Sequence, residues 1–255
     1  MSEWALFDLA EADPTPAGPP VGGPVGWTAA DWERLYGELD ERGAAVTPPL
    51  LTPAECAELA ATFERRDLFR STVEMDRHGY GRGTYRYYAD PDALPLVRRL
   101  REELYPGLAR AANRWARLLG EPAYPDRLAA LHARCAERGQ LRPTPLILRY
   151  GPGGYAALHQ DVYGELVFPL QVSVLLSDPE ADFTGGESVF VEQRPRAQSR
   201  AVVVRPGLGQ GVVFPVRERP VHGPQGVRRH AVRHGSGEVG HGVRYVLGVI
   251  FHHAR

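Results

Sequence analysis

Four residues in the C-terminal half of the chain carry the chemistry that this sequence suggests. His159 and Asp161 stand two positions apart in the segment LHQD, and a strand would project both side chains to one face. His234 supplies a second imidazole from a distant segment. Two imidazoles and one carboxylate occupy one face of an octahedral Fe(II) and leave positions open for a co-substrate and O2. Arg244, ten residues after His234, could bind a co-substrate carboxylate with both of its terminal nitrogens.

This set predicts a non-haem iron oxygenase that consumes 2-oxoglutarate. His159, Asp161 and His234 would be both the metal ligands and the catalytic residues. A His-x-Asp triplet arises by chance about 0.4 times in a chain of this composition, so location carries the argument. His159 follows a strand-like run at residues 146–150, and Arg244 opens another. The alternative is a histidine at a strand end beside an exposed aspartate in a turn.

Other histidines compete for the distal ligand position. His222 lies in a loop-like setting before Gly-Pro, and His230 shares strand parity with His234, so it could point inward. His252 and His253 are adjacent, and at most one of them can face a cavity. Arg244 could instead pair with a carboxylate of the protein. The spacing from His234 to Arg244 favours the metal and co-substrate assignment.

The composition is that of a globular chain without a strong overall field. The 255 residues are 43% hydrophobic and suit one compact domain with appendages, or two intimately packed units. The net charge is −1, and all 30 basic residues are arginine, a bias typical of GC-rich bacterial genomes. Cys56 and Cys135 form no metal-binding or disulfide pattern and are expected to be buried thiols. No signal-peptide core or long apolar run is present, so a cytoplasmic location without membrane contact is expected.

The N-terminal half divides into two regions. Residues 1–26 are rich in Pro and Gly and are expected to form a flexible arm. Residues 27–141 are expected to form a region of helices and short strands that packs on a barrel. Apolar spacing and caps predict an extended run at 43–51, two short strands within 69–89, and helices at 28–42, 52–65, 94–119 (with a kink or break at Tyr105-Pro106) and 125–138.

Residues 142–255 change to short strands separated by Gly and Pro turns, and are expected to form the catalytic core. The predicted strands are Leu146–Tyr150, Ala156–Asp161, Leu166–Leu176, Ser188–Glu192, Ala201–Val204, Gly211–Val216, Val227–His234 and Arg244–Phe251. Eight such strands indicate a double-sheet jelly roll. The predicted fold class is therefore mainly β with α (α+β): a double-stranded β-helix with N-terminal buttressing helices.

The segments RPTPLILRYGPGGYAALHQDVYGELVFPLQVSVLLS and DFTGGESVFVEQRPRAQSR resemble a bacterial family of Fe(II)/2-oxoglutarate dioxygenases. That family is described as acting on damaged nucleic acid, through similarity to AlkB-type dealkylases, and the resemblance covers most of the chain after about residue 30. It implies a double-stranded β-helix that uses Fe(II), 2-oxoglutarate and O2. His159, Asp161 and His234 match its iron ligands, Arg244 matches the residue that pairs with the distal carboxylate of 2-oxoglutarate, and Tyr150 matches a tyrosine that helps hold this co-substrate.

Two positions depart from the AlkB-type pattern. Leu148 stands where those enzymes have Asn, and Ile250 stands where they have a second Arg. The ten-residue spacing from His234 to Arg244 is closer to the prolyl-hydroxylase type. The resemblance therefore implies the oxidative chemistry more firmly than the substrate.

Several substrates fit these observations. One candidate substrate is methylated single-stranded nucleic acid. The candidate contacts for it at the mouth of the barrel are Tyr85, Arg86, Tyr87 and Arg149. Hydroxylation of a protein side chain or a small metabolite is an alternative, and a non-catalytic cupin-like binding barrel is another. Gln171 is expected either to contact 2-oxoglutarate or to pack in the core. Nothing in the sequence defines an oligomeric state.

Overall fold

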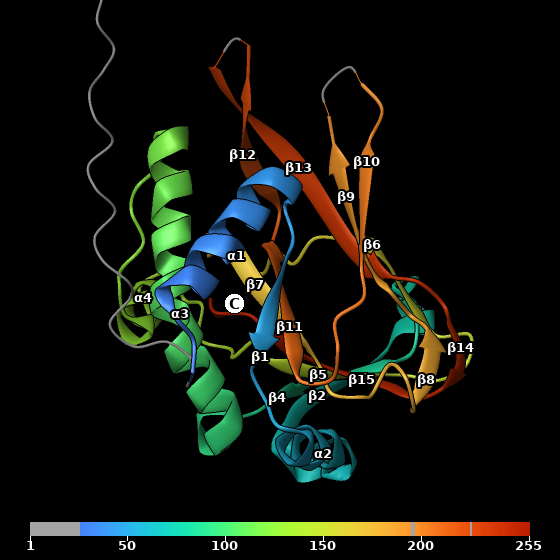
Figure 1. The fold of residues 1–255 in the computed structure, drawn as a ribbon. Coiled ribbons are helices and arrows are strands. Elements are labelled where there is room, and N and C mark those ends of the chain that lie inside the picture. Colours follow the sequence, from blue (N-terminus) through green and yellow to red (C-terminus); the bar gives the residue numbers. More distant parts are fainter. Residues whose placement is uncertain (1–25, 195–196, 225) are drawn as a thin grey trace, which may run out of the picture.

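The computed structural model describes residues 26–194, 197–224 and 226–255, so nearly all of the predicted N-terminal arm lies outside the described residues. The described chain is built on two antiparallel sheets that face each other (Figure 1). One sheet has seven strands in the order β1-β11-β7-β15-β5-β4-β2. These strands are β1 (Ala45–Pro49), β2 (Phe69–Glu74), β4 (Thr84–Tyr88), β5 (Leu146–Tyr150), β7 (Leu170–Leu175), β11 (Gln210–Pro215) and β15 (Arg244–Val249).

The second sheet has the order β10-β9-β13-β6-β3, and β12 pairs with β13 beside it. Its strands are β3 (Gly81–Arg82), β6 (Tyr155–His159), β9 (Ser188–Gln193), β10 (Arg200–Val204), β12 (Glu218–Gly223) and β13 (Gly226–Ser236), while β8 (Phe183–Gly185) and β14 (Val239–Gly242) form a separate pair. All eight predicted strands are present, which confirms the double-stranded β-helix, but β6 ends at His159, two residues before Asp161, and β7 begins at Leu170 rather than Leu166. Strands β1 to β4 extend both sheets, so residues 27–141 contribute strands as well as helices.

The helices cover the outer face of the seven-stranded sheet. They are α1 (Ala29–Arg42), α2 (Pro53–Ala61), α3 (Pro95–Leu119) and α4 (Leu128–Ala136), with short 3-10 turns at Thr62–Glu64, Arg66–Leu68, Met75–His78 and Pro91–Ala93. Leu35 and Leu100 share one buried cluster with Leu247 of β15, which confirms that the helices buttress this sheet. Cys56 and Cys135 are buried and free, as predicted. None of the helices in the described ranges has the length and apolar character of a membrane-spanning segment.

Two helix predictions need correction. Of the kink or break predicted at Tyr105-Pro106, the break does not occur, because α3 runs through Pro106 as one helix. Tyr105 is fully buried, and the ring of Trp32 lies so close to Gly107 that a Cβ there would meet it at 2.2 Å. Tight packing on both sides of Pro106 outweighs the lost hydrogen bond. The fourth helix begins at Leu128, three residues after the predicted start at Pro125.

Two β-hairpins extend beyond the body of the barrel and lie side by side (Figure 1). One is formed by β9 and β10, and the other by β12 and β13. Strand β12 was not predicted, because its sequence ERPVHG contains a proline and ends in glycine. Strand β13 spans 11 residues and runs from the tip of its hairpin into the barrel.

A buried histidine pair predicts acid sensitivity. The rings of His132 and His253 stack with centroids 4.0 Å apart, and His132 Nε2 lies 2.9 Å from Arg101 Nη2 and 3.1 Å from the carbonyl oxygen of Phe251. Burial lowers the pKa of His132 to about 3 and that of His253 to about 4.

The unfolded chain therefore binds more protons than the folded protein below the ordinary histidine pKa of 6.5. The contribution of the two neutral histidines to the free energy of unfolding is complete above that pH and is lost as the pH falls towards 4. Chemical denaturation should show that the free energy of unfolding is lower by on the order of 2 kcal/mol at pH 5, after allowance for partial exposure. His132→Gln should flatten this dependence; an equal pH slope in the variant would contradict the assignment.

Candidate metal centre and co-substrate pocket

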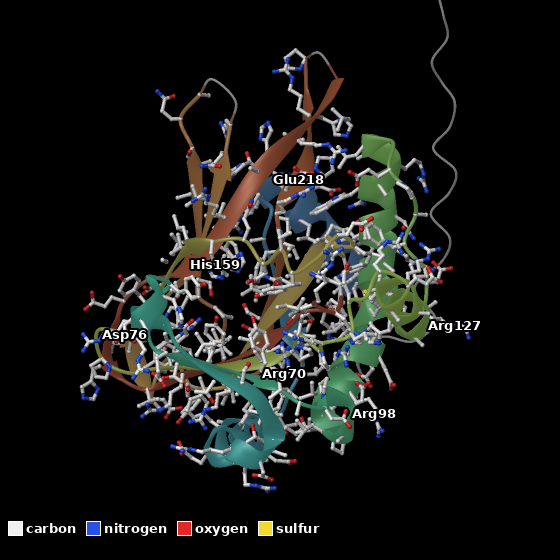
Figure 2. All side chains as sticks on the ribbon, turned by 180° about the vertical axis from the view of Figure 1, so that it is seen from behind. Arg70, Asp76, Arg98, Arg127, His159 and Glu218 are labelled. Carbon is white, nitrogen blue, oxygen red and sulfur yellow. The ribbon has the colours of Figure 1, made fainter. Side chains whose placement is uncertain are left out.

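The register between β6 and β13 brings three side chains together. His159 ends β6 and is the direct register partner of His234 on β13. Asp161 follows two residues after His159, and one nitrogen or oxygen from each of the three lies within 4.8 Å of the others. The two imidazole centroids are 4.2 Å apart. Figure 2 shows His159 near the base of the two hairpins. The sequence-predicted cluster is thus assembled from adjacent strands.

The Asp161 carboxylate is held at both oxygens. Tyr163 donates to Oδ1 at 2.6 Å, Gln171 donates to Oδ2 at 2.9 Å, and His234 Nε2 lies 3.2 Å from Oδ2. Burial alone would raise the pKa of this carboxyl, but the hydrogen bond and charge of His234, with smaller effects of His159 and Tyr163, hold the pKa well below its usual range. The carboxylate is therefore ionised, as a metal ligand must be.

The two imidazoles are also prepared to bind a cation. His159 Nδ1 lies 2.7 Å from the carbonyl oxygen of Ala157, and donation to this oxygen leaves Nε2 with a free lone pair. Burial lowers the pKa of His234. The Nδ1 atom of His234 is buried without a hydrogen-bond partner among the described residues. Two imidazoles beside one carboxylate fit a divalent iron.

A cavity of about 420 Å³ extends from this cluster into the barrel. Arg244 lines it on β15 and is the register partner of Tyr150 on β5, with the guanidinium 5.6 Å from the centre of the Tyr150 ring. Arg244 is 5% exposed and has no ion pair within the described ranges. Burial lowers its pKa, so an anionic ligand would relieve an uncompensated charge. A Cβ at Gly186, where φ is +66°, would meet Arg244 Cδ at 2.9 Å, so glycine there leaves room for the arginine.

Gln171 lies closer to the metal cluster than to Arg244. Its side-chain nitrogen lies 2.9 Å from Asp161 Oδ2 and 3.2 Å from His234 Nε2, and its oxygen is buried without a partner among the described residues. The amide therefore orients the carboxylate. A contact between Gln171 and 2-oxoglutarate stays a prediction.

The competing histidines lie apart from the cluster. His222 is exposed on β12, and His230 Nδ1 lies 3.0 Å from Glu192 Oε1. His252 is fully buried, with Nδ1 accepting from the backbone of Phe168 at 3.3 Å. Neither these three nor His253 joins the cluster that His159, Asp161 and His234 form within the described chain.

Two predicted contacts at the mouth are wrong. Arg86 is only 8% exposed, packs over the ring of Phe63 at 4.1 Å and donates to the Phe63 carbonyl, so it cannot reach a ligand in the cavity. Arg149 is exposed but turned away from the cavity, and donates to the hydroxyl of Tyr245 at 3.1 Å. Strand alternation puts Arg86 on the face opposite Tyr85 and Tyr87, and Arg149 on the face opposite Leu148 and Tyr150, which line the cavity.

The mouth of the cavity is aromatic. Tyr80 lines it, is 51% exposed and stacks on the ring of His78 with centroids 5.3 Å apart. Leu158 beside it is 43% exposed. Tyr85 and Tyr87 line the cavity further in and meet edge to face at 5.5 Å. The entrance thus presents flat apolar surfaces rather than charges.

Tyr163 is a site residue that sequence reasoning missed. Its hydroxyl links the Asp161 carboxylate to the hydroxyl of Tyr87, which donates to it at 3.0 Å. Burial and the Asp161 charge raise the pKa of Tyr163 well above its ordinary value, so it stays a donor. The signal was available, because residues 159, 161 and 163 share the alternation that selected the first two.

Solved structures share the fold. A prolyl hydroxylase from Trichoplax adhaerens, in complex with a hypoxia inducible factor oxygen degradation domain peptide fragment, aligns with a TM-score of 0.56 and 14% identity over 87% of this chain and 89% of that chain. The non-heme alpha ketoglutarate dependent epimerase SnoN from nogalamycin biosynthesis aligns with a TM-score of 0.53 and 18% identity over 88% of this chain and 83% of that chain. These likenesses show the fold, and within it the described chain carries a His-Asp-His cluster that could hold a metal ion, as predicted.

Residues 83–254 match the family model Oxygenase-NA, described as an oxygenase catalysing oxidative methylation of damaged DNA, and the chain belongs to this family. Two relatives from Mycobacterium tuberculosis, the uncharacterized proteins Rv2227 (strain ATCC 25618 / H37Rv) and MT2286 (strain CDC 1551 / Oshkosh), are each 51% identical over 160 residues, covering 62% of this chain and 69% of theirs. Membership confirms the predicted class and enzyme, and leaves the non-catalytic cupin-like barrel without support.

Proposed function

We propose that this enzyme binds Fe(II) through His159, Asp161 and His234 and uses 2-oxoglutarate to oxidise an alkylated base in single-stranded nucleic acid. The observation that carries the proposal is the combination of one carboxylate and two imidazoles with a buried arginine that has no ion pair among the described residues, all in one cavity. A cation site and an anion site in one pocket suit a metal and a dicarboxylate bound together.

Each residue has a definite task in this proposal. The Arg244 guanidinium pairs with the far carboxylate of 2-oxoglutarate, and the Tyr150 ring beside it shapes that end of the cavity. Tyr163 and Gln171 hold the Asp161 carboxylate in one orientation. Fe(II), when bound with 2-oxoglutarate and O2, supplies the oxidation of a C–H bond with release of succinate and CO2. The buried walls keep water from the reacting atoms.

The nature of the mouth supports a flat, uncharged substrate group. The exposed ring of Tyr80 offers a stacking surface at the entrance, and the tyrosines deeper in carry no charge. A base inside a duplex could not enter a cavity in a barrel, so the substrate must be single-stranded or flipped out. The family description, which names damaged DNA, agrees with this class.

The proposal is tested by product release. Iron-loaded protein should convert 2-oxoglutarate to succinate and release formaldehyde from N-methylated single-stranded oligonucleotides, with unmethylated strands of the same sequence as the control. Succinate formation without formaldehyde from any methylated strand would reject nucleic-acid demethylation while leaving the oxygenase chemistry intact.

A second candidate is hydroxylation of a protein side chain. The fold is shared with a prolyl hydroxylase solved with a peptide, and the ten-residue spacing from His234 to Arg244 is of that type. Mass spectrometry of a proline-containing peptide pool after incubation with 2-oxoglutarate would detect the gain of one oxygen. The mouth favours the first candidate, since it presents rings rather than backbone-pairing groups.

We predict that Tyr163→Phe weakens metal binding without unfolding the protein. The variant removes the donor to Asp161 Oδ1, and loss of such an outer partner typically costs about 10–100-fold in metal affinity. Calorimetric titration with Co(II) measures this directly and does not depend on turnover. Tyr87→Phe is the matched control, because it leaves Tyr163 free to donate to Asp161. Equal affinities for the two variants would contradict the role of Tyr163.

A further inference from the structure

The segment that forms the two projecting hairpins is strongly basic. Residues 192–233 contain nine arginines and two glutamates, which gives them a charge of +7 in a chain whose net charge is −1. The rest of the chain therefore has a charge of −8. Within the described part of this segment, every arginine except Arg219 is exposed. The near-neutral total conceals a local positive surface.

This basic surface is continuous with the metal cluster. Strand β13 carries His234, and exposed Arg233 is its neighbour in the chain. Arg228 lies six residues before His234 on the same strand, which corresponds to about 20 Å at the usual rise of an extended chain. In the sheet order β9-β13-β6-β3, strand β6 with His159 lies next to β13 of the β12–β13 hairpin. On its other side, the backbone N–H of Ala157 in β6 donates to the carbonyl oxygen of Tyr80.

A groove of about 700 Å³ lies between the turn-proximal end of the β9–β10 hairpin, strand β12 and the helices α1 and α3. Five arginines line it, and three acidic residues oppose them: Arg114, Arg117, Arg194, Arg200 and Arg219 face Asp40, Glu41 and Glu192. The lining is therefore net positive.

Two of the three acidic residues of the groove are already paired, and Asp40 binds Arg114 at 2.7 Å. Arg219 forms an ion pair with Glu192 Oε2 at 2.6 Å, and His230 Nδ1 lies 3.0 Å from Oε1. Arg194 contacts the same carboxylate at a longer distance, 3.4 Å from Oε1. Arg200 contacts only a backbone carbonyl, at 3.5 Å. Arg117 is exposed and has no ion pair within the described ranges. Arg117 and Arg200 thus have no carboxylate partner among the described residues, and Arg194 shares Glu192 with Arg219 and His230, so these three guanidinium groups can contact an external anion.

We propose that the two hairpins and this groove bind the sugar–phosphate backbone of a single-stranded nucleic acid, which then crosses the metal centre towards Tyr80. The inference rests on the proposed function and names where the substrate strand lies. Single-stranded nucleic acid is favoured over an acidic protein because arginines along an extended surface are joined to an exposed aromatic ring at the cavity mouth. A basic track with stacking rings is the usual architecture of single-strand binders.

The test is the salt dependence of binding of an unmethylated, labelled oligonucleotide of about 16 nucleotides. Each phosphate contact on a single strand contributes about −0.7 to the slope of log K against log salt. The triple variant Arg117→Gln, Arg194→Gln, Arg200→Gln should therefore lower the magnitude of the slope by about 2 and weaken binding at low salt by at least about 10-fold.

The matched control is Arg66→Gln, Arg98→Gln, Arg127→Gln, which removes the same charge from exposed positions elsewhere. Figure 2 shows Arg98 and Arg127 on the helical side of the molecule, away from His159. The control should keep the wild-type slope and affinity. Equal losses in both triple variants would overturn the proposal, as would wild-type protein that fails to bind at low salt.

Two further measurements separate this inference from the proposed reaction. Substrate-independent turnover of 2-oxoglutarate should be equal in wild type and in the groove variant, because none of the three arginines lines the metal cavity. Groove-dependent binding of single strands without formaldehyde release from methylated strands would reject demethylation and leave the track intact. An acidic polypeptide or a duplex that binds as tightly as the single strand would overturn the choice of partner.

Discussion

The His234→Ala variant is expected to lose nearly all iron-dependent turnover while keeping its fold. His234 is one of the three side chains that form the cluster within the described chain, and its Nε2 lies 3.2 Å from Asp161 Oδ2. Loss of a residue that hydrogen-bonds a metal ligand lowers metal affinity or activity by about 10–100-fold, and loss of a ligand itself should lower them further. His159→Ala and Asp161→Ala should behave alike. Succinate release and Co(II) titration measure the effect, and circular dichroism verifies the fold.

His222→Ala is the control for this series. His222 is exposed on β12 and lies outside the cluster, so this variant should retain most of the activity and full metal occupancy. An inactive His222→Ala beside an active, metal-loaded His234→Ala would show that the distal ligand has been assigned to the wrong histidine.

The Arg244→Ala variant should raise the KM for 2-oxoglutarate far more than it weakens metal binding. Arg244 is buried, has no ion pair within the described chain and lines the cavity beside Tyr150. Removing one partner of a desolvated charge pair costs roughly 2–5 kcal/mol, or at least about 30-fold in affinity. Steady-state kinetics with varied 2-oxoglutarate, together with Co(II) titration, separates the two effects.

Arg149→Ala provides the comparison. Arg149 lies on β5, which pairs with β15, the strand that carries Arg244. Unlike Arg244, Arg149 is exposed and donates to the hydroxyl of Tyr245. It should leave the KM for 2-oxoglutarate unchanged. An unchanged 2-oxoglutarate titration in Arg244→Ala would remove the co-substrate role from this arginine.

Sequence patterns predicted the metal cluster because strand alternation is local. His159 and Asp161 lie two residues apart, and the paired strands β6 and β13 supply the remaining ligand in register. Alternation also separates Arg86 from Tyr85 and Tyr87, and in the structure Arg86 packs against Phe63 while the two tyrosines line the cavity. Which of the two faces lines the cavity is a tertiary fact that the two-residue period does not contain.

Other features depend on contacts between distant segments. Pro106 predicted a break in α3, but buried Tyr105 and the fit of Trp32 against Gly107 keep the helix continuous. The bond from Tyr87 to Tyr163 joins residues 76 positions apart. The net charge of the chain does not reveal the positive charge of the hairpins, because acidic residues elsewhere in the sequence balance it.

The pairing of His159 with His234 across β6 and β13 has a consequence for how the protein folds. Side chains alternate between faces, so a slip of one residue between these strands would turn one imidazole to the outside of the barrel. Only the native alignment creates the metal-binding face. Iron should therefore bind only the correctly aligned chains in a refolding mixture. Its binding would stabilise the native strand register over the misaligned ones.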